Sequence, residues 1–538
     1  MKLKMPTFIG LRIVVLCILV ALVCILARNA GEGQTGDQRV TIRFAHWQLE
    51  DGPREAFDRI AARYMQIHPN VRVVQLPIPE RIYTNWLITQ LVGETAPDLI
   101  QISVTANDER TARFFTPLSN LASTPNPYNQ GTDLEKVPLR ETLFDGMEGG
   151  YNSNLFHHYG VPISGFTIRM FYNVELLGKI TGSTHIPETY EELVAVCQKV
   201  KEYSRHQGLP IVPIAGSRYN GPMLLSRLFA SQTQTLVQKL NPVGIVGGDA
   251  VRRAGDYLDG RWSLDSPEVR SGFDLLREVS QFMQPGFLQL QRDDATLLFV
   301  QQRAVMICTG SWDATSIRRQ ADFPIGVGII PFPSKTHPVY GRYTLGSLSE
   351  AGTNGGIVFG LTRHCQNPEI ARDFLLFLSS RPVNQLWTDA SHWIPAVIGT
   401  NVDDKVAPFL PVTQGELSGI SPTIDSQGDG MAFPEVRRTY MNSLYQLMDP
   451  SESTASFINL IREGYSKGII SDLRRQSRMS LDLIQGSDTQ GTALAWQARR
   501  GNAGSQRRYE NFLQSSSLNE RKYFQIQLIL RSNQSSPR

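Results

Sequence analysis

The stretch LLFVQQRAVMICTGSWDATSIRR, residues 297–319, contains the pattern that decides the fold. Its apolar run at residues 304–308 predicts a buried strand, which the pair Thr309-Gly310 ends. The polar residues 313–319 predict a short helix, and Trp312 stands between the two elements, at the open end of the strand. A strand that turns directly into a helix is the repeating unit of an α/β protein.

The same alternation of strands and helices runs through the rest of the chain. Val40, Ile42 and Phe44 alternate with polar residues as in a half-buried strand, and residues 53–64 carry an apolar stripe at helical spacing. Residues 266–283 repeat the helical pattern. With 538 residues, of which 41% are apolar, the chain can fill more than one core. The sequence therefore predicts two α/β lobes rather than one large sheet.

Charge is concentrated at the two ends of the chain. The formal net charge is +3, yet residues 1–28 carry +4 and residues 491–538 carry +6, so the body between them is mildly acidic. Nucleic-acid-binding proteins concentrate basic residues on their folded body, and this chain does not. We expect no nucleic-acid partner.

The first thirty residues predict export. Lys2, Lys4 and Arg12 precede an uninterrupted apolar run at residues 13–27, which is typical of a secretory signal. Fifteen helical residues span about 22 Å, short of the roughly 30 Å hydrocarbon core of a membrane. No clean cleavage site follows, so residues 1–30 are either a signal peptide or an N-terminal membrane anchor. The expected location is the periplasm or another extracytoplasmic space.

No pattern in the sequence supports catalysis, a metal or a cofactor. Phosphate-binding loops, dinucleotide-binding loops, nucleophile elbows and zinc-protease helices are all missing. The pair His157-His158 is a poor chelator, because adjacent side chains point apart on a strand. The carboxylate doublets are also sequence neighbours, so we read them as solvated loop charges: Glu50/Asp51, Asp293/Asp294 and Asp403/Asp404.

Several segments, taken in order, resemble family 1 extracellular solute-binding proteins, the maltose-binding-protein-like components of sugar-importing ABC transporters. The segments that carry the resemblance are RVTIRFAHW, FDRIAARYMQIHPNVRVV, APDLIQIS, FTPLSNLAS, YGVPISGFTIRMFYNVELLGKI, TYEELVAVCQKVK, WSLDSPEVRSGFDLLREV, LFVQQRAVMICTGSWD and NGGIVFGLTRHCQNPEIARDFLLFLSSRP. The resemblance extends over residues 38–480. The basic residues after 486 have no counterpart in the pattern.

The resemblance implies a two-lobed periplasmic-binding-protein fold of type II. Each lobe is then an α/β sandwich, and a hinged cleft between the lobes holds the ligand. The expected organisation is lobe 1 in residues 38–165, lobe 2 in 166–345, a return to lobe 1 in 346–400, helices on lobe 2 in 401–485 and a basic extension in 486–538.

Trp312 is the strongest candidate for a ligand contact. A sugar ring presents C–H groups on one face and hydroxyl groups around its rim, so an aromatic plane suits the first and polar groups suit the second. In the resembled family the tryptophan of the equivalent turn contributes to the cleft, and Trp312 matches that position. The alternative is that Trp312 only packs under the following helix.

Other positions match ligand contacts of the resembled family. Trp47 ends the first strand, with packing in the core of lobe 1 as the alternative. Ser103 and Thr105 follow the strand APDLIQI, where the family places polar sugar contacts. Tyr219 and Asn220 match a strand-end loop with ligand contacts.

The remaining candidates are less direct. Phe166 stands where maltose-binding protein has an acidic contact, so we expect a different specificity. Asp313 is expected to accept a rim hydroxyl or to cap the helix after Trp312, and capping is favoured slightly. Phe433 matches a late segment that can offer an aromatic ring. Trp393 is expected in the core rather than at the cleft edge.

The function that the resemblance implies is binding of an oligosaccharide or related solute and its delivery to an ABC import permease, without catalysis and as a monomer. Two alternatives stay open. One is a membrane-tethered sensor of the same fold, which a retained N-terminal anchor would favour. The other is a carbohydrate-active enzyme, which requires two carboxylates that converge across the cleft.

Overall fold

The computed structural model describes residues 39–103, 107–152, 155–241, 250–351, 355–424, 433–501 and 503–534. Thr105 and the predicted signal or anchor segment, residues 1–30, lie outside these ranges. Among the described helices, none combines the length and the apolar composition that crossing a membrane requires.

Lobe 1 is built on a five-stranded sheet with the strand order β2-β1-β3-β11-β6. Its first three strands along the chain run parallel, and β11 lies antiparallel to both of its neighbours. The strands of this sheet are β1 (Val40–His46), β2 (Val71–Pro77), β3 (Leu99–Gln101), β6 (Val161–Ser164) and β11 (Ile357–Leu361). A small hairpin of β4 (Tyr151–Asn152) and β5 (His157–His158) stands beside it.

The helices of lobe 1 bury their apolar stripes against this sheet. Phe57 and Ile60 of α2 and Phe374 of α14 are fully buried in one core with Phe44 of β1, as the alternating pattern of the sequence predicts. The helices of this lobe are α2 (Asp51–Ile67), α3 (Glu80–Val92), α4 (Asp108–Phe114), α5 (Ser119–Ala122), α14 (Pro368–Leu378) and α15 (Arg381–Ser391).

Lobe 2 is built on a four-stranded sheet with the order β10-β7-β9-β8. β9, one of its two inner strands, contains the apolar run of residues 304–308 and ends at Gly310, and every residue in it is buried. The strands are β7 (Ile168–Asn173), β8 (Val212–Ala215), β9 (Ala304–Gly310) and β10 (Ile325–Gly328). Beyond β9 a single turn, Ser311–Asp313, leads into α13 (Ala314–Gln320), as the sequence predicts.

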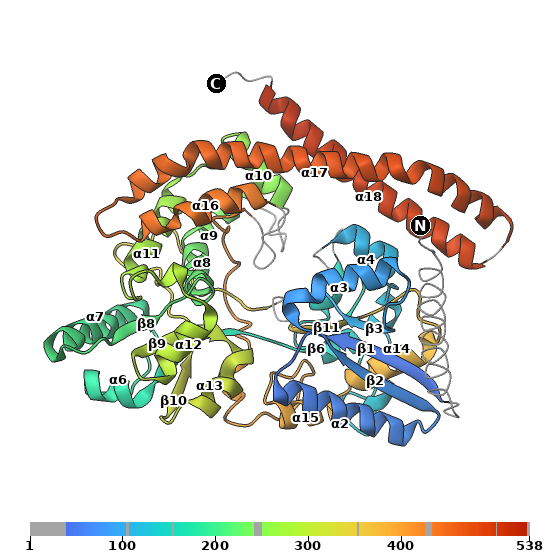
Figure 1. Cartoon of the computed structure of the whole chain (residues 1–538), viewed down its shortest axis with the longest axis horizontal. Coiled ribbons are helices and arrows are strands. Elements are labelled where there is room, and N and C mark those ends of the chain that lie inside the picture. Colours follow the sequence, from blue (N-terminus) through green and yellow to red (C-terminus); the bar gives the residue numbers. More distant parts are fainter. Residues whose placement is uncertain are drawn as a thin grey trace, which may run out of the picture.

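The helices of lobe 2 begin where the sequence places start signals. Thr189 and Glu192 form a complete capping box at the start of α7, and Pro267 occupies the first turn of α11. The described α-helices of this lobe before α13 are α6 (Val174–Thr181), α7 (Tyr190–Gln207), α8 (Asn220–Gln232), α9 (Gln234–Leu240), α10 (Ala250–Leu258), α11 (Pro267–Ser280) and α12 (Arg292–Val300). The two lobes lie side by side in Figure 1, each a mixed sheet covered by helices, which confirms the predicted fold class.

The chain ends in long helices that are not confined to one lobe. α16 (Pro434–Leu447) and the first part of α17 (Thr454–Arg499) pack on lobe 2, and α18 (Ala503–Gln534) folds back along α17. We call α17 and α18 the C-terminal hairpin, which lies above both lobes in Figure 1. α17 continues without a break through residue 486, where the sequence predicts the start of a basic extension.

Candidate functional site

Trp312 lies at the carboxyl end of β9, where its indole folds back over the strand. A Cβ atom on Gly310 would lie 2.3 Å from Cε2 and Cζ2 of Trp312, so only a glycine leaves room for the ring. Phe166 meets the indole edge to face, with 5.3 Å between the ring centroids and 65° between the planes. Both rings are half-buried, and Trp312 also packs against the hydrophobic cores of both lobes. The pair forms an aromatic corner next to the interlobe connection.

Polar groups surround this aromatic corner. Arg292, the first residue of α12, forms an ion pair with Asp313, and Thr309 Oγ1 donates a hydrogen bond to the same carboxylate. The guanidinium carbon of Arg292 lies 5.0 Å from the ring centroid of Tyr219, whose side chain is 37% exposed. Partial burial raises the pKa of the Tyr219 hydroxyl to about 12, while Arg292 opposes the shift. Donors and acceptors therefore stand beside an exposed aromatic surface.

Lobe 1 contributes charge to the same place. Glu50 precedes α2 and Glu80 is the first residue of α3, so both stand at helix starts after parallel strands. Loss of solvation raises the pKa of Glu50, with Arg292 lowering it and Asp313 raising it. Glu80 acts in turn on Tyr219. Both carboxylates therefore interact electrostatically with residues of lobe 2. The interlobe site is the set Phe166, Tyr219, Arg292, Thr309, Trp312 and Asp313 of lobe 2 with Glu50 and Glu80 of lobe 1.

Polar side chains are buried where β1 and β3 end in lobe 1. Gln101 Oε1 accepts hydrogen bonds from the backbone N–H of Trp47 and from Gln48 Nε2, each at 3.3 Å. His46 Nδ1 accepts from the backbone N–H of Gln48 at 3.2 Å, and Nε2 lies 3.1 Å from Gln75 Oε1. Burial lowers the pKa of His46 to about 4, so this imidazole is neutral at physiological pH. The carboxyl ends of these strands are thereby held in a fixed shape.

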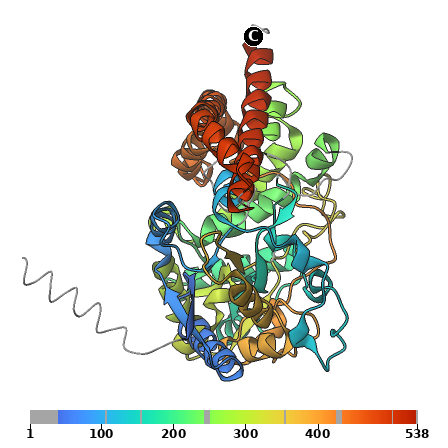
Figure 2. The same cartoon turned by 90° about the vertical axis from the view of Figure 1, so that its right-hand side faces the viewer.

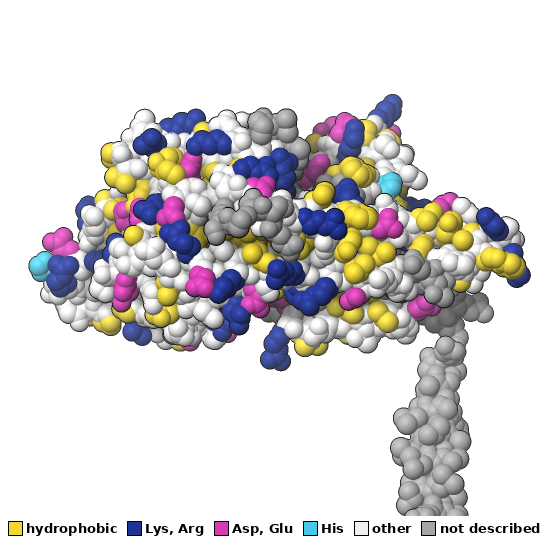
Figure 3. All heavy atoms as spheres, turned by 90° about the horizontal axis from the view of Figure 1, so that it is seen from above, with side chains coloured by type: hydrophobic (Ala, Val, Ile, Leu, Met, Phe, Trp, Pro, Cys, Tyr) yellow, Lys and Arg dark blue, Asp and Glu magenta, His cyan; other side chains and the backbone are white. Residues whose placement is uncertain are grey.

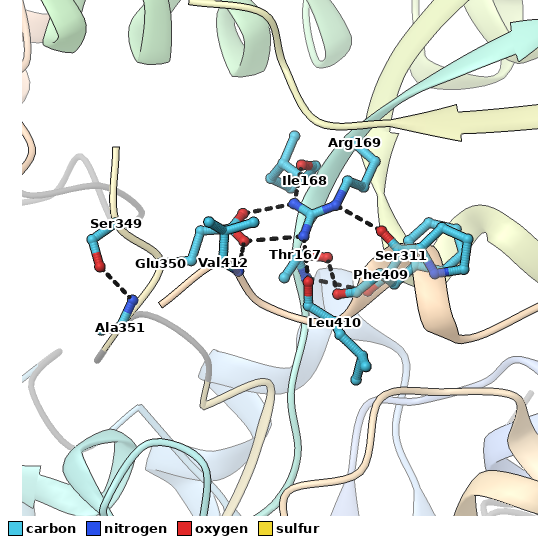
Figure 4. Close-up of polar contacts among 11 residues, drawn as sticks. Thr167, Ile168, Arg169, Ser311, Ser349, Glu350, Ala351, Phe409, Leu410 and Val412 are labelled. Atoms are coloured by element: carbon cyan, nitrogen blue, oxygen red, sulfur yellow. Dashed lines mark hydrogen bonds and ion pairs between the residues drawn. The ribbon is translucent and has the colours of Figure 1, made fainter. Parts of the chain in front are cut away.

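A single buried arginine ties together the chain segments at the lobe boundary. Arg169 on β7 donates to both carboxylate oxygens of Glu350 and to the backbone oxygens of Pro408 and Leu410. Figure 4 shows these contacts converging on one guanidinium. They join β7, the segment that returns to lobe 1 and the segment that leaves it again.

The aromatic corner is attached directly to this boundary. Thr167 exchanges hydrogen bonds with Ser311, through its N–H to Ser311 Oγ at 3.3 Å and through its carbonyl oxygen to the Ser311 N–H at 2.9 Å. Phe166 and Trp312 are the chain neighbours of this pair, so the lobe crossing sets their relative position.

The other predicted site residues occupy different places. Trp47 is half-buried and packs edge to face on Tyr83, with 4.9 Å between the centroids, in a cluster of lobe 1. Ser103 is exposed after β3. Asn220 is buried, and its side chain donates to the Cys308 carbonyl and accepts from Ser217 Oγ, which holds the loop before α8 in place. Phe433 is fully buried in the core of lobe 2.

Two further expectations concern single side chains. Asp313 stands at the start of α13 but makes no capping hydrogen bond, so the favoured capping role is wrong, since Thr309 and Arg292 occupy its carboxylate. Trp393 lies in the core of lobe 1, as predicted, against Trp387.

Sequence reasoning missed four residues of the interlobe site: Arg292, Thr309, Glu50 and Glu80. Arg292 is the first residue of α12, and the two residues after it, Asp293 and Asp294, form a doublet that the sequence predicts to be solvated. A single arginine beside such a doublet matches no pattern that would predict a site. Glu50 belongs to the doublet Glu50/Asp51, which the sequence also predicts to be solvated. Its charged neighbours from lobe 2, Arg292 and Asp313, lie more than two hundred residues away in the chain, so no local pattern predicts their approach.

Sequence relatives share most of their length with this chain. An uncharacterized ABC transporter extracellular-binding protein of Pyrococcus horikoshii is 21% identical over 434 residues, 78% of this chain and 86% of its own. The multiple sugar-binding protein of Streptococcus mutans is 20% identical over 396 residues, 71% of this chain and 80% of its own.

Solved structures share the fold. The unliganded RafE of Streptococcus pneumoniae superposes with a TM-score of 0.57 at 16% identity, over 81% of this chain and all of its own. The maltotriose-bound MalE domain of Bdellovibrio bacteriovorus does so with a TM-score of 0.53 at 15% identity, over 80% of this chain and all of its own.

The model of bacterial extracellular solute-binding proteins matches residues 59–407, which is well over half of the chain. This match includes the whole sheet of lobe 2, every strand of the lobe 1 sheet except β1, and all residues of the interlobe site except Glu50. The chain therefore belongs to the bacterial extracellular solute-binding protein family, and it is a solute-binding protein of an ABC transporter rather than an enzyme.

Proposed function

We propose that this protein binds an oligosaccharide or related carbohydrate at the interlobe site and delivers it to an ABC import permease. The observation that carries the proposal is the aromatic corner of Trp312 and Phe166, half-exposed at the carboxyl end of β9 and edged by fixed polar groups. Carboxyl ends of strands at the boundary of two lobes are the common location of ligand sites in α/β folds.

The chemistry of the corner fits a sugar. The indole face of Trp312 covers the C–H face of a pyranose ring, which by analogy with stacked bases contributes about 1–3 kcal/mol. Arg292 donates and Asp313 accepts, so together they satisfy hydroxyl groups at the ring edge. Tyr219 adds a hydroxyl that its raised pKa keeps protonated, and hence available as a donor. Glu50 and Glu80 supply acceptors from the opposite lobe.

The ligands named for the relatives agree with this assignment. The Streptococcus mutans relative is named as a multiple sugar-binding protein, and structures that share the fold hold raffinose and maltotriose. Phe166 places an apolar ring beside Trp312, where the resemblance predicts an acidic contact, and we therefore expect this site to have its own sugar preference.

A thermal-shift screen tests the proposal. The purified protein is melted with mono- and oligosaccharides, with amino acids and short peptides as a comparison set. A ligand at one hundred times its dissociation constant adds about 2.7 kcal/mol of stability, which is readily seen as a higher melting temperature. Stabilisation by at least one carbohydrate supports the proposal, and isothermal titration then gives the affinity. Stabilisation by a peptide or amino acid, with none from any sugar, would overturn it.

A further inference from the structure

The C-terminal hairpin touches both lobes, and its two attachments are unequal. The first is made by α17 on lobe 2. One face of this helix is buried in the core that also contains β7 and α11. Its residues, each at most 1% exposed, are Ile458, Ile461, Tyr465, Ile469 and Leu473. α16 packs against the same helix. This part of the hairpin is an integral piece of lobe 2.

The C-terminal half of α18 is attached to the same lobe. Ile526 is fully buried in the lobe 2 core, and Ile529 packs so closely on α10 that a Cβ on Gly255 would lie 3.0 Å from its Cδ1 atom. Gln527 Nε2 donates to Ser477 Oγ of α17 at 2.8 Å. Hairpin and lobe 2 therefore move as one body.

The N-terminal half of α18 reaches lobe 1. Leu518 is half-buried against the cluster of lobe 1 that contains Tyr83, Phe115 and Tyr159. Gln514 Nε2 donates to the Leu155 carbonyl oxygen at 3.4 Å, and α18 lies along α4. Figure 2 shows α18 descending from the C-terminal end toward the helices of lobe 1. Gln514 and Leu518 are only half-buried there, whereas Ile526 of the same helix is fully buried on the side of lobe 2, so we take the attachment to lobe 1 as the weaker one.

A rigid helix that is fixed to one lobe and contacts the other resists any rotation between them. Solute-binding folds close by rotating about the hinge, and a rotation displaces lobe 1 under α18. During such a rotation we expect the contact between α18 and lobe 1, the weaker of the two attachments, to break or to slide. We propose that the C-terminal hairpin is a latch, carried by lobe 2, whose Leu518–Gln514 contact with lobe 1 holds the two lobes in the observed arrangement and must be released when they rotate.

The latch is an addition to the shared fold. The family match ends at residue 407, before α16 begins, and the solved structures extend over about 80% of this chain while including nearly all of their own residues. The family match thus contains the interlobe residues of lobe 2 but not the hairpin, so we assign to the hairpin a contribution to the motion of the lobes.

The test measures the distance between the lobes without any ligand, so its outcome does not depend on the sugar assignment. Spin labels are placed at two exposed helical positions, Ala62 of α2 and Ala195 of α7, through an unnatural amino acid, since the chain has cysteines of its own. Double electron–electron resonance then gives the distribution of interlobe distances in the full-length protein.

The key variant is Leu518→Asp, which places a charge in the contact with lobe 1. The matched control is Leu528→Asp on the same helix, where the residue is 70% exposed. Figure 3 shows the molecule from above, the side on which the C-terminal hairpin lies in Figure 1, with hydrophobic side chains among lysines and arginines. We expect L518D to broaden the distance distribution and shift its mean, and L528D to reproduce the wild type.

The milder pair Gln514→Ala with Leu518→Ala repeats the test without a buried charge. A folded L518D protein with the wild-type distance distribution would overturn the proposal. Loss of cooperative unfolding in both the aspartate and the alanine variants would also overturn it, because the contact would then be part of the core rather than a releasable latch.

Discussion

Arg169 and Glu350 form a bidentate ion pair at the boundary between the lobes, with Nη1–Oε1 at 2.7 Å and Nη2–Oε2 at 3.0 Å. The arginine side chain is 1% exposed and the glutamate side chain 22%. Burial of two charges is costly, and here the guanidinium offsets the cost by donating to three backbone carbonyls as well. The pair thus fixes the geometry from which any hinge rotation starts.

Arg169→Met is expected to lower the free energy of unfolding by about 3–5 kcal/mol, because it removes the cation paired with Glu350 and the donor to the carbonyls of Pro408 and Leu410. Glu350 Oε2 still accepts from the Val412 N–H, but its charge is then uncompensated by Arg169. Urea unfolding measures the change. The control is Arg372→Met, which removes an exposed helical pair with Glu369 and should cost at most about 1 kcal/mol.

The double variant R169M/E350M isolates the unpaired charge. It should recover part of the loss, since replacing both partners by apolar groups is often close to neutral. A single variant as stable as the control would contradict a net stabilising role of the ion pair.

Gly310→Ala is expected to displace the indole of Trp312 and to weaken ligand binding without unfolding lobe 2. The backbone at position 310 has a φ of −81°, which alanine adopts freely, so the steric conflict at 2.3 Å from the ring is the only cost. Tryptophan fluorescence and isothermal titration detect the two effects.

Gly486→Ala is the control, because nothing lies within 4 Å of the added methyl group. It should leave binding unchanged and stabilise α17 slightly. Wild-type affinity in G310A would mean that the ring position is irrelevant to the ligand.

Trp312→Ala should weaken carbohydrate binding by about 1–3 kcal/mol, roughly 5- to 150-fold, because the variant loses the flat apolar face on which the sugar ring lies. Trp496→Ala removes an indole that is 62% exposed on the C-terminal hairpin and should change neither affinity nor stability. Titration and thermal melts on both variants separate the roles. A stability loss of about 3–5 kcal/mol with unchanged affinity would assign Trp312 to packing alone.

The local parts of this fold are readable from the sequence. β9 and the turn at Trp312 follow from an apolar run that ends at Thr309-Gly310, and the start of α7 follows from Thr189 and Glu192. Such signals lie within a few residues of the element they specify, so periodicity and capping rules find them.

The parts that failed depend on contacts between distant segments. Glu50 reaches Arg292 only because two lobes fold against each other, and nothing near either residue encodes that approach. Phe433 has the character of a cleft aromatic in sequence, yet the fold buries it completely. The sequence predicts only a basic extension after residue 486, because α17 and α18 bury narrow stripes whose partners belong to both lobes.

The neutral state of His46 makes stability depend on pH in the acid range. The Gln48 N–H donates to Nδ1, so the proton resides on Nε2, which donates to Gln75 Oε1, and no acceptor remains for a second proton. Burial lowers the pKa from 6.5 to about 4 in the folded protein, so the unfolded chain binds the proton first as the pH falls. The stability contributed by His46 is therefore complete above pH 6.5 and is lost progressively down to about pH 4, by about 3 kcal/mol in total.

His46→Gln should flatten this dependence, because glutamine cannot take up the proton in either state. The measurement is the urea midpoint at a series of pH values between 7 and 4, compared with the wild type. His185→Gln serves as the matched control, since that imidazole is 57% exposed and its loss should leave the acid dependence of the wild type in place. The comparison is made on slopes rather than on absolute stability, because His46→Gln also alters packing around Gln48 and Gln75. Equal slopes for H46Q and the wild type would show that other groups, and not this buried imidazole, set the acid limit of lobe 1.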